Sequence, residues 1–190
     1  MKKNSQGFSL IEVLVTIVLT TVGILGMVAL QSKSIQYTQD AVNRNAAVTL
    51  SNDLIEIMRT HRDDLFLNKP PLEYSYTELK ASSDIYDASG VLQLTAANCP
   101  DSALAHSLQE QGDCWVKQVV ETLPDASALL AGSFKACPSF KLDDNGEPVC
   151  AGSSYKGSTL AIQLAWRSKE SVCGKNSDSD ICTFTTRVEL

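Results

Sequence analysis

The sequence begins Met1-Lys-Lys-Asn-Ser-Gln-Gly7 and continues into Phe8-Ser-Leu-Ile-Glu12-Val-Leu-Val15, the start of an apolar run that reaches Leu30. A secretory signal peptide places its apolar segment before the cleavage site and loses that segment on processing. Here the order is reversed, because the short basic leader comes first. Cleavage after Gly7 would therefore leave the apolar segment on the mature chain.

The apolar run is long enough to cross a membrane. A helix rises about 1.5 Å per residue, so residues 8–30 match a hydrocarbon core of about 30 Å. Lys2 and Lys3 precede the run, and the next basic residue is Lys33. Because positive charge is retained in the cytoplasm, we expect a cytoplasmic leader and an exported chain.

Glu12 is the one charged residue inside this run. Placed near the cytoplasmic interface, its carboxylate can reach the headgroup region, which is the simpler interpretation. The second interpretation depends on cleavage after Gly7, which creates an amine on Phe8 four residues before the carboxylate. Such a pair suits a charge interaction within one helix or between neighbouring helices.

The segment from Gly7 to Val15 resembles the class III signal of type IV pilins and their relatives. The resemblance rests on the basic leader, on glycine before phenylalanine, and on glutamate as the fifth mature residue. It implies that a membrane peptidase cuts after Gly7 and methylates the new N-terminal Phe8. It also implies that Glu12 guides docking of the subunit into a helical filament.

The cysteines indicate an oxidising compartment. All six lie beyond the apolar helix, and an even count in an exported chain predicts disulfides, here in a bacterial periplasm. Fifteen pairings are possible. We expect sequence neighbours to pair, because each pair closes a short polar or turn-rich loop: Cys99 with Cys114, Cys137 with Cys150, and Cys173 with Cys182.

The sequence has no pattern typical of a cofactor, metal or nucleic-acid site. His61 and His106 are isolated and no C-x-x-C pair occurs, which argues against zinc, and no catalytic motif is present, so we predict a non-enzyme. Without the leader the chain has 14 basic and 22 acidic side chains, a net −8 that disfavours nucleic acid.

In one acidic loop, residues 174–181, oxygen-bearing side chains occur at every second position, as the first ligands of a calcium-binding loop do. Its acidic and amide residues are Asn176, Asp178 and Asp180, but Ile181 stands where a calcium loop needs glycine. We expect a solvated loop closed by a disulfide, although some secretion pseudopilins, which are relatives of the pilins, bind calcium in C-terminal loops.

Beyond Leu30 the helical pattern becomes amphipathic and continues to about Arg59. The whole helix would be on the order of 80 Å long, and its second half needs a cover. The apolar stripe that we expect to be buried consists of Ile35, Val42, Ala46, Leu50, Leu54, Ile57 and Met58.

Residues 61–98 read as an irregular connection, and residues 113–123 as a helix stopped by Pro124, with Trp115 in the core. Strands are expected at residues 133–142, 159–167 and 183–190, with a hairpin turn at Asn145-Gly146. An antiparallel sheet of three to four strands would cover the helix.

These elements predict an α+β fold of the type IV pilin kind, with a long N-terminal helix on an antiparallel sheet held by disulfides. We divide the chain into a leader (1–7), a membrane or filament-core helix (8–30), its amphipathic continuation (31–60) and a periplasmic globular head (61–190).

Several stretches also resemble the PilV-type minor pilins of type IVa pili: residues 23–31, 35–38, 54–59, 114–115, 164–167 and 187–190. The resemblance implies a low-abundance subunit that joins other minor pilins, primes pilus assembly at the inner membrane and ends near the filament tip with a large adhesin. Twitching motility and adhesion would depend on it. Many major pilins carry a proline in the first helix, and this chain has none between residues 8 and 60.

Two other functions stay open at this point. A type II secretion pseudopilin has the same anchor and differs only in the head. Alternatively, the chain is an adhesive or ligand-binding module that a pilus displays, which an exposed aromatic or basic cleft would favour.

Overall fold

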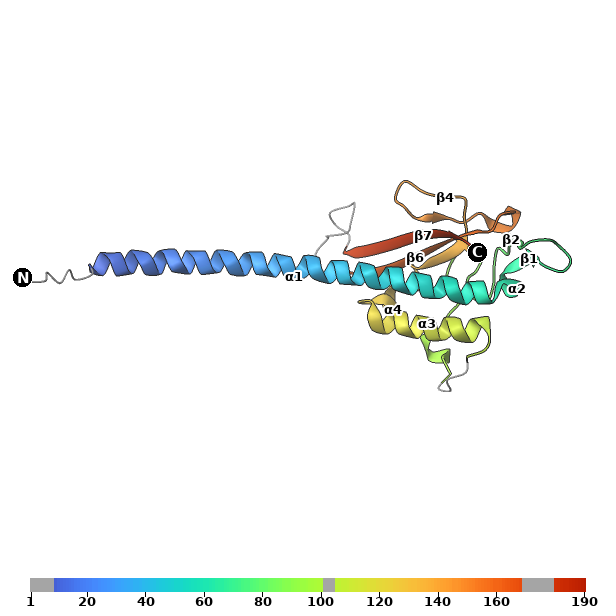
Figure 1. The fold of residues 1–190 in the computed structure, drawn as a ribbon, viewed down its shortest axis with the longest axis horizontal. Helices are drawn as coiled ribbons and strands as arrows, with labels where there is room; N and C mark the ends of the chain where they lie inside the picture. The colour runs from blue at the N-terminus through green and yellow to red at the C-terminus, as the bar shows by residue number, and fades with distance from the viewer. Residues whose placement is uncertain (1–8, 101–104, 169–179) are drawn as a thin grey trace, which may run out of the picture. The chain divides into compact units, whose positions relative to one another are not determined.

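The computed structural model describes residues 9–100, 105–168 and 180–190. The chain divides into two compact units, residues 1–39 and 40–190. Helix α1, Leu10–Thr60, contributes to both (Figure 1). The expected α+β fold is confirmed, with a long apolar N-terminal helix and an antiparallel sheet.

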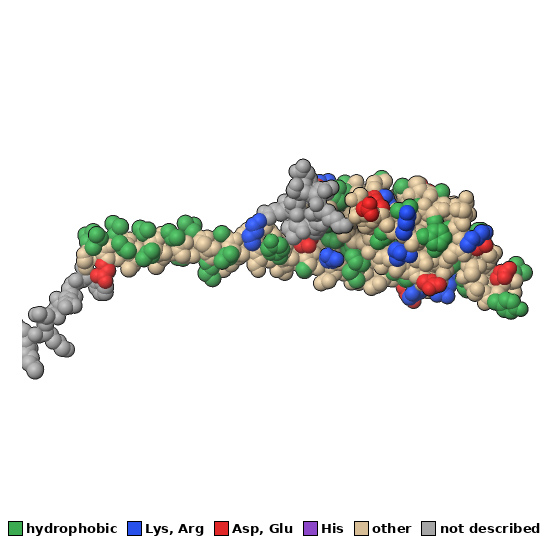
Figure 2. Space-filling model, turned by 90° about the horizontal axis from the view of Figure 1, so that it is seen from above, with side chains coloured by type: hydrophobic (Ala, Val, Ile, Leu, Met, Phe, Trp, Pro, Cys, Tyr) green, Lys and Arg blue, Asp and Glu red, His purple; other side chains and the backbone are tan. Residues whose placement is uncertain are grey.

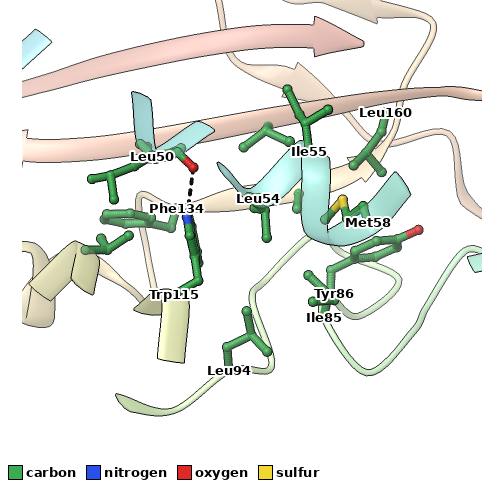
Figure 3. Close-up of a cluster of buried hydrophobic side chains, with 14 of the residues drawn as sticks. Leu50, Leu54, Ile55, Met58, Ile85, Tyr86, Leu94, Trp115, Phe134 and Leu160 are labelled. Carbon is green, nitrogen blue, oxygen red and sulfur yellow. Dashed lines mark hydrogen bonds between the residues drawn. The ribbon is translucent and has the colours of Figure 1, made fainter. Parts of the chain in front are cut away.

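The part of α1 in the second unit is buried along a broad face. The fully covered residues recur every three to four positions, as one side of a helix requires: Ala47, Leu50, Ser51, Leu54, Ile55 and Met58. Figure 1 shows the sheet on one side of this stretch and α3 on the other. In Figure 3, α1 residues meet side chains from the strands, from α3 and from the loop around Tyr86.

The expected stripe was wrong at its beginning. Ile35 is 59% exposed and Val42 is 60% exposed. Ile35 lies in the first unit, and Val42 precedes Ala46, the first α1 residue that packs against the core. The elements of the head therefore cover a shorter length of the helix than the sequence pattern suggests.

The main sheet has three antiparallel strands in the order β3-β6-β7, namely Lys135–Pro138, Thr159–Arg167 and Ile181–Glu189. The central strand is buried from Leu160 to Trp166. Gln163 is 2% exposed, but its amide donates to the carbonyl of Ser133 and accepts from the Thr185 hydroxyl. The central strand therefore buries a polar side chain whose nitrogen and oxygen each have a hydrogen-bond partner.

The run expected as one strand over residues 133–142 is broken in two. β3 ends at Pro138, and β4 (Lys141–Leu142) pairs with β5 (Pro148–Val149) instead. The Ser139 hydroxyl lies at the break, 2.8 Å from the Lys141 carbonyl and 2.9 Å from that of Val149. The predicted hairpin turn is confirmed, with Gly146 at φ +84°.

Helix α3, Leu108–Thr122, begins five residues earlier than expected. Ser107 and Glu110 form a capping box, in which each side chain accepts a backbone N–H at the helix start. Gly112 lies inside the helix, at a place where a Cβ would come within 2.7 Å of Leu94 and 2.9 Å of Ile85. Trp115 is 3% exposed, so its predicted place in the core is confirmed.

The connection after α1 is mostly irregular, as predicted. It contains α2 (Arg62–Leu65), the paired strands β1 (Phe66–Asn68) and β2 (Thr77–Leu79), and the short 3-10 helix η1 (Ala96–Asn98). Two further short helices follow, α4 (Ala126–Leu129) and η2 (Gly152–Ser154). Tyr86 anchors the connection: it is fully buried, burial raises the pKa of its hydroxyl, and the hydroxyl donates to the Lys80 carbonyl.

Candidate functional site

Gly7 and Phe8, the expected processing site, lie outside the described residues. The description starts at Ser9, whose carbonyl accepts the backbone N–H of Glu12 at 3.0 Å and that of Val13 at 3.3 Å. The helix therefore begins directly after Ser9. Glu12 is placed in the first turn of α1.

Glu12 is exposed, and within residues 9–100, 105–168 and 180–190 no ion pair to its carboxylate is present. The first turn of a helix carries unpaired N–H groups and a partial positive charge, both of which favour a carboxylate there. The position thus presents a negative charge at the helix start on an otherwise apolar surface, which suits a cation from a neighbouring molecule.

The first unit of α1 is apolar and exposed. Leu10 is 83% exposed, Leu25 69% and Leu30 74%, and Figure 2 shows hydrophobic side chains along this stretch. By length and composition, the helix is long and apolar enough to cross a membrane. These features fit a membrane anchor.

The threonine hydroxyls of this stretch are hydrogen-bonded within the helix. The hydroxyls of Thr16, Thr20 and Thr21 donate to backbone carbonyls three or four residues earlier, at 2.8 to 2.9 Å. In a hydrocarbon environment an unpaired hydroxyl would be costly, so this arrangement suits lipid or a packed helix bundle. A Cβ added at Gly23 or Gly26 would meet nothing within 4 Å, so the helix surface there is open to close approach by another helix.

Two disulfides lie wholly within the described residues of the head. Cys99 and Cys114 join the end of η1 to the middle of α3, and Cys137 and Cys150 join β3 to the residue after β5. These are the neighbouring pairs that the sequence suggested. Cys182 is also disulfide-bonded. Its expected partner Cys173 lies outside the described residues, so that pairing stays a prediction.

Sequence reasoning missed Gly90, which packs directly on a disulfide. Its φ is +87°, and a Cβ built on it would lie 2.7 Å from Sγ of Cys150 and 3.3 Å from Sγ of Cys137. The Asp87 carboxylate fixes this turn by accepting the Ser89 hydroxyl and the N–H groups of Ser89 and Val91, which lowers the pKa of Asp87. Asp and Gly three residues apart are a turn signal, but the contact with the disulfide is tertiary.

The expectation about metals is tested only in part. Among the described residues no group of three or more His, Cys, Asp or Glu side chains is arranged to hold a metal ion. Asn176 and Asp178 of the acidic loop lie outside those residues. Asp180 is described, and its carboxylate pairs with Arg167.

The described surface of the head carries open grooves. One of about 260 Å³ is lined by Asp53, Ile57, Ala105, Gln111, Cys114, Trp115 and Gln118. Another of about 460 Å³ is polar and lies at the end of α1, with Arg59, Arg62 and Asp63 among its residues. The second groove also includes Thr60 and His61, whose Oγ1 and Nδ1 atoms lie 3.0 Å apart. Both atoms are also within hydrogen-bond distance of the Ile57 carbonyl, which holds them against the end of α1.

A comparison with protein families adds one finding. The model of the prokaryotic N-terminal methylation motif matches residues 2–28, which include Gly7, Phe8 and Glu12. No curated protein and no solved structure matches the chain significantly.

Proposed function

We propose that this chain, which its N-terminal methylation motif marks as a type IV pilin-like prepilin, is a minor pilin of the type IV pilus. The motif points to a structural protein rather than an enzyme. The observation that carries the proposal is the match over residues 2–28, continued by an apolar helix whose surface is exposed. Such a helix needs partners outside its own chain.

Processing is the first step of the proposal. The prepilin peptidase cuts between Gly7 and Phe8 and methylates the Phe8 amine. The Glu12 carboxylate then pairs with the N-terminal amine of a neighbouring subunit as the helix enters the helical bundle of the filament. The exposed place of Glu12 in the first turn supports this step, because a charge pair in a low-dielectric bundle is strong only when the partner can reach it directly.

The proposed location follows from the same elements. The mature chain is a single-pass protein of the bacterial inner membrane, with its N-terminus in the cytoplasm and its head in the periplasm. Disulfides in the head support an oxidising compartment. After assembly the chain lies in the pilus near its tip.

The proposed role is initiation rather than bulk filament growth. The chain joins other minor pilins and a tip adhesin in a priming complex on the inner-membrane assembly platform, and the major pilin is added below it. The lack of proline between residues 8 and 60 and the stretches that resemble PilV-type minor pilins support this assignment. Twitching motility and adhesion depend on the pili that the complex starts.

The test is a pilus count in the bacterium that produces the protein. We expect Glu12→Ala, and a substitution of Gly7 that blocks cleavage, to reduce pilus number and twitching. Glu56→Ala is the matched control, because it removes an exposed carboxylate from the same helix outside the motif. Normal piliation in both the Glu12 and the Gly7 variants would contradict the proposal.

The second candidate is a minor pseudopilin of type II secretion, since the methylation motif fits a pilin-like or a pseudopilin protein equally well. Deletion of the gene separates the two candidates. A minor pilin leaves protein secretion intact and lowers pilus number, whereas a pseudopilin does the reverse. Co-purification with pilus or secretion components gives an independent answer.

A further inference from the structure

The loop between β1 and β2 presents apolar side chains at its tip. Leu72 is 92% exposed and Tyr74 is fully exposed, and Pro70 and Pro71 beside them are exposed as well. We call these four residues with Glu73 the hairpin tip. Figure 1 shows this connection as a loop projecting from the head. Neighbouring apolar residues with this degree of exposure typically mark an interaction surface.

The base of the loop is firmly held, in contrast to its tip. Phe66 is paired with Leu79 across the two strands, and both are buried. The Tyr76 hydroxyl donates to the Asp63 carboxylate at 2.8 Å, a bond that raises the pKa of Tyr76. Lys69 Nζ donates to the Asp63 carbonyl at 2.9 Å. These contacts fix the base in advance, which lowers the entropy lost when the tip binds a partner.

The tip also carries a charge. Glu73 lies between the two most exposed apolar residues, and no hydrogen bond or ion pair to its carboxylate is present among the described residues. A carboxylate in this place is repelled by the anionic lipid surface of a membrane. The convex tip is also the wrong shape for a small molecule, which binds in a concave site. Shape and charge together select a protein pocket that is apolar and bordered by Lys or Arg.

Three grooves on the described surface of the head do not suit the tip of a second copy. One of them is lined only by polar and charged residues, including Lys80, Asp64 and Asp84, so it does not match Leu72. The groove that includes Ile57 and Trp115 has Asp53 as its charged residue, which would repel Glu73. The groove that contains Arg59 and Arg62 is lined by polar and charged residues together with Tyr76, so it does not match Leu72.

We infer that the hairpin tip docks into an apolar, Lys- or Arg-bordered pocket on the head of another pilin-like subunit. Leu72 and Tyr74 fill the pocket and Glu73 pairs with the cation at its border. Aromatic and large apolar anchors surrounded by a complementary polar rim are the usual centre of a protein interface. That the partner is a pilin-like subunit rests on the proposed function. The shape and charge of the tip do not.

The experiment uses the full chain in its own bacterium. Tyr74 is replaced by the photo-crosslinking residue p-benzoylphenylalanine, which keeps an aromatic ring at the tip. After irradiation of intact cells, the attached peptide is sequenced by mass spectrometry. We expect attachment to another protein with an N-terminal methylation motif, at apolar residues next to Lys or Arg.

Variants in the same crosslinking chain test the anchor and the charge separately. We expect Leu72→Ser and Glu73→Lys each to lower crosslink yield about tenfold, the effect of losing one interface anchor or reversing its charge. Val149→Ser, which shortens an exposed apolar residue on β5, should leave the yield within about twofold because it lies outside the tip. All three positions are exposed, so the variants should fold normally, and immunoblots confirm equal amounts of chain.

Attachment to lipid, attachment to a second copy, no protein adduct, or a yield unchanged by Glu73→Lys would each overturn the inference. Pilus counts in a deletion strain test the proposed function separately. If deletion of the gene reduces piliation but the chain forms no crosslink, the docking surface is rejected and the proposed function is kept. If the chain crosslinks to a pilin-like head but deletion of its gene leaves piliation normal, the docking surface is supported and the pilus role is rejected.

Discussion

The two halves of α1 belong to one helix, but their side chains have opposite surroundings. Leu25 and Leu30 are about as exposed as side chains on an isolated helix, at 69% and 74%. Leu50 and Leu54, in the second half, are at most 2% exposed. The first half is apolar around its whole circumference, whereas the second has an apolar face that the head covers. The chain thus supplies a core for one half and leaves the other half to a membrane or to partner helices.

This difference separates the free energy of folding the head from the free energy of inserting or assembling the anchor. Burial of a leucine side chain contributes roughly 1.5 to 3 kcal/mol. In the second half that contribution stabilises the fold of the head. In the first half it becomes available only when lipid or a neighbouring subunit covers the helix, so substitutions there should affect insertion and assembly more than folding.

The largest effect on folding is expected for Trp115→Ala. Trp115 is buried against α1, and its indole N–H donates to the Leu50 carbonyl at 2.8 Å. The substitution should lower the free energy of unfolding by about 3 to 5 kcal/mol, through the cavity and the lost hydrogen bond. Denaturant titration of the full chain in detergent, followed by near-UV circular dichroism, measures this.

Leu25→Ala is the control in the exposed half of α1. It should change the same unfolding free energy by less than about 0.5 kcal/mol, because its side chain is 69% exposed. Equal destabilisation by the two substitutions would show that the anchor contributes to the stability of the head. It would contradict the difference between the two halves of α1.

A smaller effect is expected for Gly90→Ala. The new methyl would lie 2.7 Å from Sγ of Cys150 at a backbone φ of +87°. Crowding against a disulfide and the left-handed backbone together should cost about 2 to 3 kcal/mol. Gly146→Ala has a similar φ, +84°, but open space around it, so it should cost only about 1 kcal/mol. An equal loss of stability in both variants would mean that the contact with the disulfide has no importance.

The smallest effect concerns pH. N–H groups of His106 and Ser107 donate to the Glu110 carboxylate and lower its pKa. A carboxyl whose pKa is lower in the folded state stabilises the fold above its ordinary pKa, and this stabilisation is lost as pH falls through the folded-state value. Thermal unfolding of the full chain should therefore show a slightly lower midpoint at about pH 3 than at about pH 6.

Glu110→Gln keeps an acceptor for the capping box but does not titrate. Between about pH 6 and about pH 3, the unfolding midpoint of the variant should therefore fall less than that of the unsubstituted chain. The other titrating groups are the same in both proteins. An identical pH dependence in the two proteins would contradict the assigned role of Glu110.

The sequence predicts the elements that local patterns encode. The apolar run, the turn at Asn145-Gly146 and the helix around Trp115 were readable because each depends on neighbouring residues. The exposure of Val42 was not readable, since it depends on where the head begins to cover α1. The same holds for Gly112 inside α3. Glycine has a low helix propensity, and the sequence does not show that Leu94 and Ile85 fill the space where a Cβ would lie.

The candidate site divides in the same way. Gly7, Phe8 and Glu12 form a local motif, which the family comparison recognises within residues 2–28. The hairpin tip has no such motif. Leu72 and Tyr74 look in the sequence like ordinary core residues, and only the exposure of the loop in three dimensions separates them from Phe66 and Leu79.

The most direct test of the account is the mass of the chain purified from membranes of its own bacterium. We predict a protein that lacks residues 1–7 and begins at Phe8 with one added methyl group on its amine. The same mature N-terminus should be found in the Trp115→Ala variant, because processing depends on the anchor and not on the head. A chain that retains Met1, or that has also lost the apolar helix, would contradict the account.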